Sequence, residues 1–182
     1  MKLILYMTIT ANGYIAKENN QTPWNEDTWS SYYRIARQYK AIIIGKKTYE
    51  IMKEFNDFEK IGNPFVIILS TSLSEKSDNL IVVKSIEETI KILNERGFKE
   101  VLICGGSKLN SSFLKENLMD EIILDIDSKI FGNGIPLFNK TDNDLRLSLI
   151  SVKKISDKLY QTYYKVVKDA KDETTQTSSL IS

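Results

Sequence analysis

Short apolar runs alternate with helix-like patterns along most of this chain, and this alternation constrains the fold more than any other feature. Runs of apolar and β-branched residues predict strands, and apolar residues at spacings of three and four predict helices. The strand-like runs cover residues 2–9, 41–44, 65–69, 80–83, 100–104 and 121–126. The helical patterns cover residues 27–39, 47–55, 85–97 and 107–117. Such alternation is typical of a largely parallel sheet covered by helices.

The last part of the chain follows a different pattern. Two strand-like runs, at 145–153 and 159–167, are joined by a short polar connection, which predicts an antiparallel hairpin. The expected fold is α/β, with a mixed, mainly parallel sheet of about eight strands flanked by helices and followed by this hairpin. Residues 1–167 are expected to form one domain. The tail, 168–182, has too few apolar residues to fold and is expected to be disordered.

Charge and cysteine content exclude several classes of partner. The 25 basic and 24 acidic side chains give a net charge of +1, so no general attraction to nucleic acid or membrane is expected. The apolar start of the chain is too short and too rich in threonine for a signal peptide or a membrane span. The single cysteine, Cys104, cannot form an internal disulfide, which favours a cytoplasmic location. Because it lies in an apolar run, we interpret it as a core residue rather than a nucleophile.

The chain contains no histidine. This excludes Ser-His-Asp and Cys-His catalytic sites and the usual zinc sites, and no metal is expected. Proton transfer has to use Asp, Glu, Lys, Tyr or water. The composition therefore favours chemistry in which a bound cofactor carries out the difficult step.

Three strand ends carry residues suited to phosphate. The run 101–104 meets Gly105 and Gly106 and then enters a helix, so that backbone N–H groups and the helix dipole face an approaching anion. Segment 45–48, Gly-Lys-Lys-Thr, follows another apolar run in the same way, and segment 70–72, Ser-Thr-Ser, a third. Each alone is also explained as a turn or a solvated lysine pair. Together they indicate a dinucleotide, although neither the P-loop nor the Gly-x-Gly-x-x-Gly pattern is present.

These pieces, in this order, resemble the dihydrofolate reductase superfamily, and within it the branch containing the RibD C-terminal domain of riboflavin biosynthesis. The resemblance spans residues 1 to about 167. It rests on segments 10–16 (Thr-Ala-Asn-Gly-Tyr-Ile-Ala), 22–24 (Thr-Pro-Trp), 44–50 (Ile-Gly-Lys-Lys-Thr-Tyr-Glu), 68–71 (Ile-Leu-Ser-Thr), 104–109 (Cys-Gly-Gly-Ser-Lys-Leu), 119–124 and 131–138. It implies an NADPH-dependent oxidoreductase, commonly a homodimer, that acts on a small molecule.

The resemblance also implies which residues hold the cofactor. Those expected to line the nicotinamide pocket are Ile15 and Ala16. Those expected near the adenosine-side phosphates are Gly45, Lys46, Lys47 and Thr48, with Ser70 and Thr71 near the ribose 2′-phosphate. Those expected to carry the pyrophosphate, across a cis Gly105–Gly106 peptide, are Gly105, Gly106, Ser107, Lys108 and Leu109.

The catalytic residues are where the chain departs from the superfamily. The helix position that carries the pterin-binding carboxylate in dihydrofolate reductases is Trp29 here. Asp27 is a nearby candidate, although two residues on a helix place it about 200° away. Asp125 aligns with a residue that faces the substrate and is the other candidate; alternatively, it is an exposed strand residue.

The resemblance is compatible with more than one substrate. The resemblance favours reduction of a phosphoribosylated aminopyrimidine, as by 5-amino-6-(5-phosphoribosylamino)uracil reductase. Dihydrofolate reductase, or reduction of another small ring, is the alternative. Trp29 also allows a third interpretation, a non-catalytic nucleotide-binding scaffold.

Overall fold

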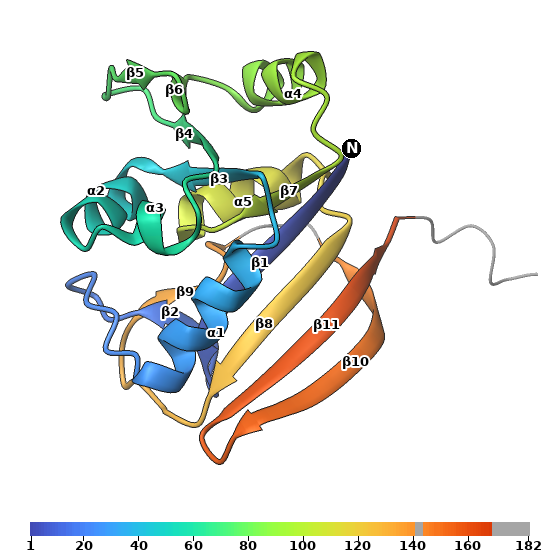
Figure 1. Cartoon of the computed structure of the whole chain (residues 1–182). Coiled ribbons are helices and arrows are strands. Elements are labelled where there is room, and N and C mark those ends of the chain that lie inside the picture. The colour runs from blue at the N-terminus through green and yellow to red at the C-terminus, as the bar shows by residue number, and fades with distance from the viewer. Residues whose placement is uncertain (141–143, 169–182) are drawn as a thin grey trace, which may run out of the picture.

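A computed structural model of the protein describes residues 1–140 and 144–168 (Figure 1). A nine-stranded sheet runs through the molecule in the order β10-β11-β8-β1-β7-β3-β4-β6-β5. Its strands are β1 (Lys2–Thr10), β3 (Ala41–Gly45), β4 (Phe65–Leu69), β5 (Lys76–Ser77), β6 (Leu80–Val83), β7 (Glu100–Ile103), β8 (Glu121–Asp127), β10 (Arg146–Ser156) and β11 (Leu159–Val167). The six strands from β8 to β6 are mutually parallel, as predicted.

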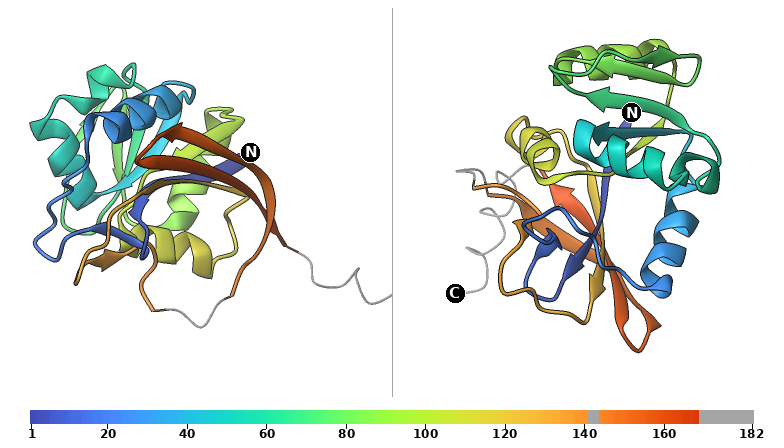
Figure 2. Two further views of the ribbon diagram at one scale, coloured as in Figure 1. Left: turned by 90° about the horizontal axis from the view of Figure 1, so that it is seen from below. Right: turned by 90° about the vertical axis from the view of Figure 1, so that its left-hand side faces the viewer.

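Helices cover both faces of the sheet (Figure 2). They are α1 (Glu26–Ala36), α2 (Lys46–Glu54), α3 (Asp57–Lys60), α4 (Ile86–Glu95) and α5 (Ser107–Lys115). Alternate strand residues point to opposite faces, so β1 sends Leu3 and Leu5 into the core under α4 and α5, and Ile4 and Tyr6 into the core under α1 to α3. Burial on both faces explains why the central strands are continuously apolar.

The C-terminal hairpin is confirmed. β10 and β11 are antiparallel and joined by a tight turn at Asp157 and Lys158, and β11 continues the sheet by pairing antiparallel with β8. The remaining tail, 169–182, lies outside the described residues. Lys168, the last residue described, places its ammonium 2.5 Å from the Asp120 carboxylate.

Four short elements were not anticipated from the sequence. β5 adds a ninth strand by pairing antiparallel with β6, where about eight strands were expected. β2 (Tyr14–Ala16) pairs with β9 (Ile135–Pro136) in a separate two-stranded sheet, and α3 is a single turn. Elements of two to four residues are too short to show a period in the sequence. Of these, the β2–β9 pair joins segments far apart in the chain.

Candidate functional site

Two of the predicted phosphate turns meet at one edge of the sheet. β3 and β7 are parallel neighbours, so their carboxyl ends lie side by side. The Gly45 backbone N–H, at the end of β3, donates a 2.9 Å hydrogen bond to the carbonyl of Gly105, which follows β7. The Gly105–Gly106 peptide is cis, as the resemblance implied. The tertiary structure therefore joins the two turns into one surface.

The two helices that start at this edge differ from the other long helices in the described chain. α2 and α5 begin after Gly45 and Gly106, neither start has a side-chain cap, and neither has an acidic residue in its first turn. By contrast, α1 and α4 are capped by Asn25 and Ser85 and carry acidic residues in the first turn. The first backbone N–H groups of α2 and α5 are thus free to donate to an anion. The helix dipole favours an anion at the same place.

Cations and hydroxyls surround the uncapped helix starts. Lys46 donates from Nζ to the Ser72 hydroxyl at 3.2 Å, which links the turn after β3 to the turn after β4. The Ser70 hydroxyl is buried and accepts from the Ser72 backbone N–H, whereas Thr71 is exposed. The structure thus gathers these residues beside the glycines: Lys46, Lys47, Thr48, Ser70, Thr71, Ser107 and Lys108.

Two further positions, Lys47 and Ser107, also have bonds within the protein, and one predicted position points elsewhere. Lys47 lies 3.6 Å from Glu50 in an exposed ion pair, and the Ser107 hydroxyl donates to Asn139. Leu109 is buried in the core under α5. At Leu109, only the backbone is left for a ligand.

The glycine backbones leave the junction of the two turns bare of side chains. A Cβ at Gly45 would sit 3.7 Å from the Gly105 carbonyl oxygen, over the meeting point of the two turns. Uncapped N–H groups, lysines and small hydroxyls around a bare backbone are the donor set that a pyrophosphate and a ribose phosphate require. The residues present therefore fit a phosphorylated dinucleotide such as NADPH.

A narrow pocket of about 110 Å³, here called the inner pocket, lies between the sheet and α1. Aromatic and apolar side chains form most of its wall, and both tryptophans of the chain face it. Its lining residues are Tyr6, Met7, Thr8, Ile15, Thr22, Trp24, Thr28, Trp29, Tyr32, Ile51, Met52, Asp57 and Cys104. Ile15, expected beside a nicotinamide ring, is thus placed in the pocket by β2, with Ala16 buried next to it.

Asp125 is fully buried behind this pocket rather than in its wall. Its carboxylate accepts a 2.5 Å hydrogen bond from the Tyr6 hydroxyl and a 2.8 Å hydrogen bond from the Gln161 amide. The alternative that Asp125 is an exposed strand residue is therefore wrong. Burial, reinforced by the Asp125 charge, raises the pKa of Tyr6 well above its ordinary value, so the phenol stays protonated and holds this bond.

The two faces of α1 separate Asp27 from Trp29. Trp29 lines the inner pocket and stacks on Tyr33, with ring centroids 6.2 Å apart. Asp27 is exposed in the first turn and does not line the pocket, as its helical offset from Trp29 predicted. Asp27 there compensates the helix dipole.

The carboxylate that does line the inner pocket is Asp57, which the sequence analysis missed. Asp57 is 2% exposed and begins α3. Its Oδ1 accepts from the Tyr33 hydroxyl at 2.8 Å and lies 3.1 Å from the Lys60 ammonium. The only signal in the sequence is the Asn56-Asp57 turn pair, in which Asn56 adopts φ +53°.

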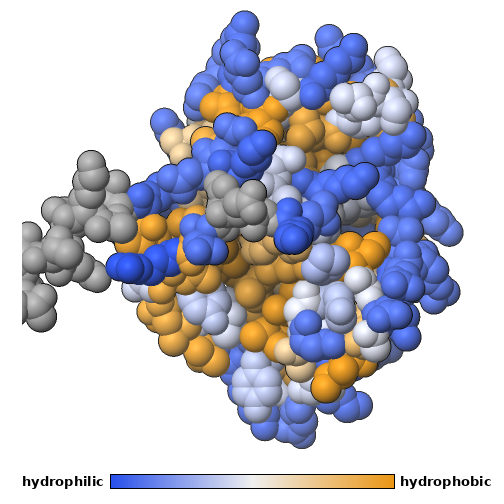
Figure 3. Space-filling view, turned by 180° about the vertical axis from the view of Figure 1, so that it is seen from behind, coloured by the Kyte–Doolittle hydropathy of each residue, from blue (hydrophilic) through white to orange (hydrophobic). Residues whose placement is uncertain are grey.

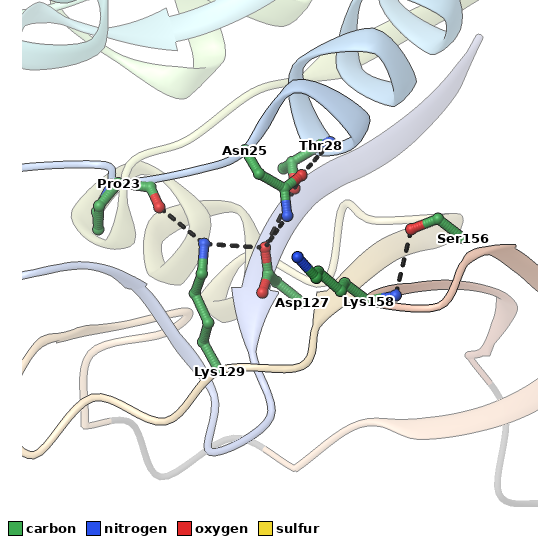
Figure 4. Close-up of polar contacts among 7 residues, drawn as sticks. All are labelled: Pro23, Asn25, Thr28, Asp127, Lys129, Ser156 and Lys158. Atoms are coloured by element: carbon green, nitrogen blue, oxygen red, sulfur yellow. Dashed lines mark hydrogen bonds and ion pairs between the residues drawn. The ribbon is translucent and has the colours of Figure 1, made fainter.

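A polar cluster fixes the loop that leads into α1 (Figure 4). The buried Asp127 carboxylate, at the end of β8, accepts from Thr28 at 3.2 Å and from Asn25 at 3.4 Å. Lys129 bridges the same carboxylate oxygen and the Pro23 carbonyl, at 3.4 and 2.9 Å. The cluster therefore ties the loop before α1 to the sheet and holds Trp24 and Thr28 in the pocket wall.

Cys104 lies in the same wall but has no nucleophilic character. Burial raises the pKa of its thiol to about 12. Its place in the core under α1 to α3 agrees with the interpretation as a core residue.

The fold and the site define a dihydrofolate reductase-like protein. Residues 1–160 match the family described as the RibD C-terminal domain. This chain belongs to that family. None of the helices in the described part of the chain is long and apolar enough to cross a membrane.

Similar proteins agree with this assignment. A Shewanella sp. PV-4 protein assigned provisionally to riboflavin biosynthesis has a structure that superimposes with a TM-score of 0.77 at 26% identity, over 92% of this chain and all of that one. The Bacillus subtilis protein YwjB, itself uncharacterised, is 26% identical over 89% of this chain and 97% of its own length. The dihydrofolate reductase of Mycoplasma genitalium is 27% identical over 70% of this chain and 77% of its own length.

Proposed function

We propose that this protein is an NADPH-dependent reductase that reduces a small molecule with a planar ring. The observation that carries the proposal is the meeting of two uncapped helix starts, at Gly45 and Gly106, beside an aromatic pocket. Both substrates that the resemblance suggests, a phosphoribosylated aminopyrimidine and a folate-like compound, contain such a ring. Their common ring is what the inner pocket is proposed to hold.

In this proposal, the N–H groups at the starts of α2 and α5 hold the cofactor phosphates, with Lys46 and Lys108 beside them. Ser70 and Thr71 contact the ribose 2′-phosphate. Ile15 and Ala16 pack against the nicotinamide ring, and NADPH when bound supplies a hydride. The protein's contribution is to hold the accepting carbon about 3–3.5 Å from the donor and to exclude water with its aromatic wall.

Asp125 is proposed to act on the substrate through Tyr6. The carboxylate fixes the Tyr6 hydroxyl, and with it the ring that lines the inner pocket. Gln161 holds the other carboxylate oxygen. Asp27 has no corresponding link to the pocket, so its proposed role is confined to stabilising the start of α1.

The test is a fluorescence titration of the purified chain with NADPH and, separately, NADH. Trp24 and Trp29 both line the inner pocket, so nicotinamide binding is expected to quench their emission. Contacts to the 2′-phosphate are expected to make NADPH bind at least about tenfold more tightly than NADH, because a hydrogen bond to a charged group contributes about 1.5–3 kcal/mol. Thr71→Ala should narrow that preference, and the exposed Lys91→Ala on α4 should leave it unchanged.

The opposite outcome favours the scaffold alternative. If neither nucleotide binds, the fold stands, but the reductase proposal fails and a non-catalytic role takes its place. If NADH binds as tightly as NADPH, the assignment of Ser70 and Thr71 to the 2′-phosphate is wrong.

We also propose that the protein is a cytoplasmic homodimer. The cytoplasmic location rests on a single buried cysteine that has no disulfide partner in the chain. The dimer rests on β10, an edge strand that exposes Leu147, Leu149, Ile150 and Val152 by 39–56%. Figure 3 shows apolar residues gathered on the side of the molecule that carries this hairpin. An exposed apolar edge of this length is suited to pairing with a second copy around a two-fold axis.

A further inference from the structure

The loop between β2 and α1, residues 17–24, carries Trp24 into the wall of the inner pocket. Three backbone hydrogen bonds stay within this loop, those from Lys17 to Gln21, from Asn20 to Lys17 and from Trp24 to Thr22. Bonds of this local kind shape a loop but do not fix it on the rest of the protein. The position of Trp24 therefore depends on side chains that reach the loop from outside.

The anchor outside the loop is Asp127, at the end of β8. The backbone of Asp127 is fixed on both sides, because it pairs with β1 and with β11. Its side chain is 1% exposed, and its Oδ2 faces three donors, the Thr28 hydroxyl, the Asn25 amide and the Lys129 ammonium. A buried carboxylate with these partners is a fixed negative charge on a rigid strand.

Lys129 links this anchor to the loop (Figure 4). Its ammonium lies 3.4 Å from the Asp127 carboxylate and donates a 2.9 Å hydrogen bond to the Pro23 carbonyl. The same ammonium lies 5.8 Å from the centre of the Trp24 ring, within the range of a cation–π contact. One side chain thus contacts both the backbone just before Trp24 and the indole itself.

A second ring supports the indole. Trp24 stacks on the buried Phe131, with ring centroids 5.9 Å apart. Asn12 fixes the backbone of Phe131, because its amide donates to the Phe131 carbonyl at 2.7 Å and accepts from the Phe131 N–H at 3.2 Å. Trp24 therefore has a fixed apolar neighbour in Phe131 and a charged neighbour in Lys129.

We infer that Lys129 is a positioning residue. Held by the buried Asp127, it sets where Trp24 lies in the wall of the inner pocket, and through Trp24 how tightly that pocket binds a ring. Lys129 is not among the described residues that line the pocket, so it acts through Trp24 and not on the ligand. The inference rests on the proposed function, since it takes the nicotinamide as a ring that contacts this wall.

The first test needs no ligand. In a Trp29→Phe background, Trp24 is the remaining tryptophan, so the emission comes from this residue alone. Lys129→Met should shift that emission to longer wavelength and increase its quenching by acrylamide, because the loop loses its link to Asp127 and the indole gains water. Asp127→Asn should shift the emission in the same direction, since it removes the charge that holds Lys129.

Two further variants show whether the cation itself matters. Lys129→Arg keeps a positive charge within reach of Asp127 and should restore most of the original emission. Lys154→Met is the matched control, because it removes a lysine whose ion pair with Asp157, at 2.7 Å, is exposed on the C-terminal hairpin. It should leave the emission of Trp24 unchanged.

The second test separates the ring from the phosphates. NADPH and 2′,5′-ADP share the phosphorylated adenosine, but only NADPH carries a nicotinamide ring. By calorimetric titration, Lys129→Met should weaken NADPH binding by about three- to fivefold, because an exposed charge pair contributes up to about fivefold to an equilibrium constant. The affinity for 2′,5′-ADP should stay the same, whereas a general loss of structure would weaken both ligands alike.

The outcomes distinguish this inference from the proposed function. An unchanged emission of Trp24 in Lys129→Met overturns the inference, and so does an equal loss of affinity for NADPH and 2′,5′-ADP. If NADPH does not bind the unmodified chain while Lys129→Met still shifts the emission, the reductase proposal fails and the positioning of Trp24 by Lys129 stands.

Discussion

At the scale of single residues, the glycines of the site are required for different physical reasons. At Gly45 a Cβ would cover the junction of the two turns, where a ligand is expected. At Gly105 the backbone has φ +81°, and a Cβ would come within 2.7 Å of the Met7 sulfur. Gly105 is therefore required mainly by its backbone conformation, because the end of the Met7 side chain is flexible and can shift.

This difference leads to a stability prediction. Gly105→Ala is expected to lower the free energy of unfolding by about 1–3 kcal/mol, because it combines an unfavourable positive φ with a contact to Met7. Urea unfolding followed by circular dichroism measures the change. The control is Gly132→Ala, where no atom lies within 4 Å of the new Cβ, and its effect should stay within about 0.5 kcal/mol. Equal stability of both variants would contradict the argument from the positive φ and the contact to Met7.

At the scale of elements, β10 is the least satisfied part of the sheet. It is an eleven-residue edge strand, and its hydrogen bonds to β11 leave its other edge open. The pairing with β11 places Leu147, Leu149 and Val152 on one face, because the bulge after Leu149 restores their alignment. On this face, apolar residues continue past the part of the sheet that the described helices cover, and they are exposed to solvent.

The proposed dimer makes this element testable. Leu149→Lys with Val152→Lys should convert the protein to a monomer, because two charges would be buried at the proposed interface. Sedimentation velocity measures the mass, and the circular dichroism spectrum should stay unchanged since both side chains are more than half exposed. The control is Ser148→Lys with Lys153→Ser, which changes two residues of the same strand and preserves its net charge. This control should stay a dimer. A monomeric unmodified protein would refute the proposal directly.

At the scale of the whole molecule, charge is divided between the two sides of the site. The net charge is only +1, yet the side proposed for the cofactor carries Lys46, Lys47 and Lys108, whereas a neighbouring groove between α1, α2 and α3 is lined by three carboxylates and one ammonium, those of Glu26, Glu54, Asp57 and Lys60. Such a division would favour an anionic cofactor on the lysine side of the proposed site.

The division predicts the effect of salt. Raising the ionic strength is expected to weaken NADPH binding several-fold, because its phosphates meet partly exposed lysines that salt screens. Calorimetric titration at low and at high potassium chloride measures the change. Lys46→Ala with Lys108→Ala should flatten the dependence, whereas Lys91→Ala with Lys99→Ala, which are exposed and away from the glycines, should leave it intact. Salt-independent binding would show that the lysines do not contact the phosphates.

Much of the architecture was already determined by the sequence. The apolar runs and helix periods predicted the parallel sheet, the flanking helices and the final hairpin, because these signals are local and repeat over many residues. The phosphate turns were also visible, since Gly and Lys at strand ends stand out from the apolar runs. Trp29 and Asp27 were correctly separated by helical geometry alone.

Only the tertiary structure decided how these parts meet. The burial of Asp125 behind Tyr6 depends on the pairing of β1 with β8 and of β8 with β11, and so brings together residues more than a hundred positions apart. Asp57 enters the pocket through a single helical turn that has no period to detect, and the neighbouring groove forms from α1, α2 and α3 together. Local patterns determine elements because they act between neighbours in the chain, whereas a site is decided by contacts between residues that only the folded chain brings together.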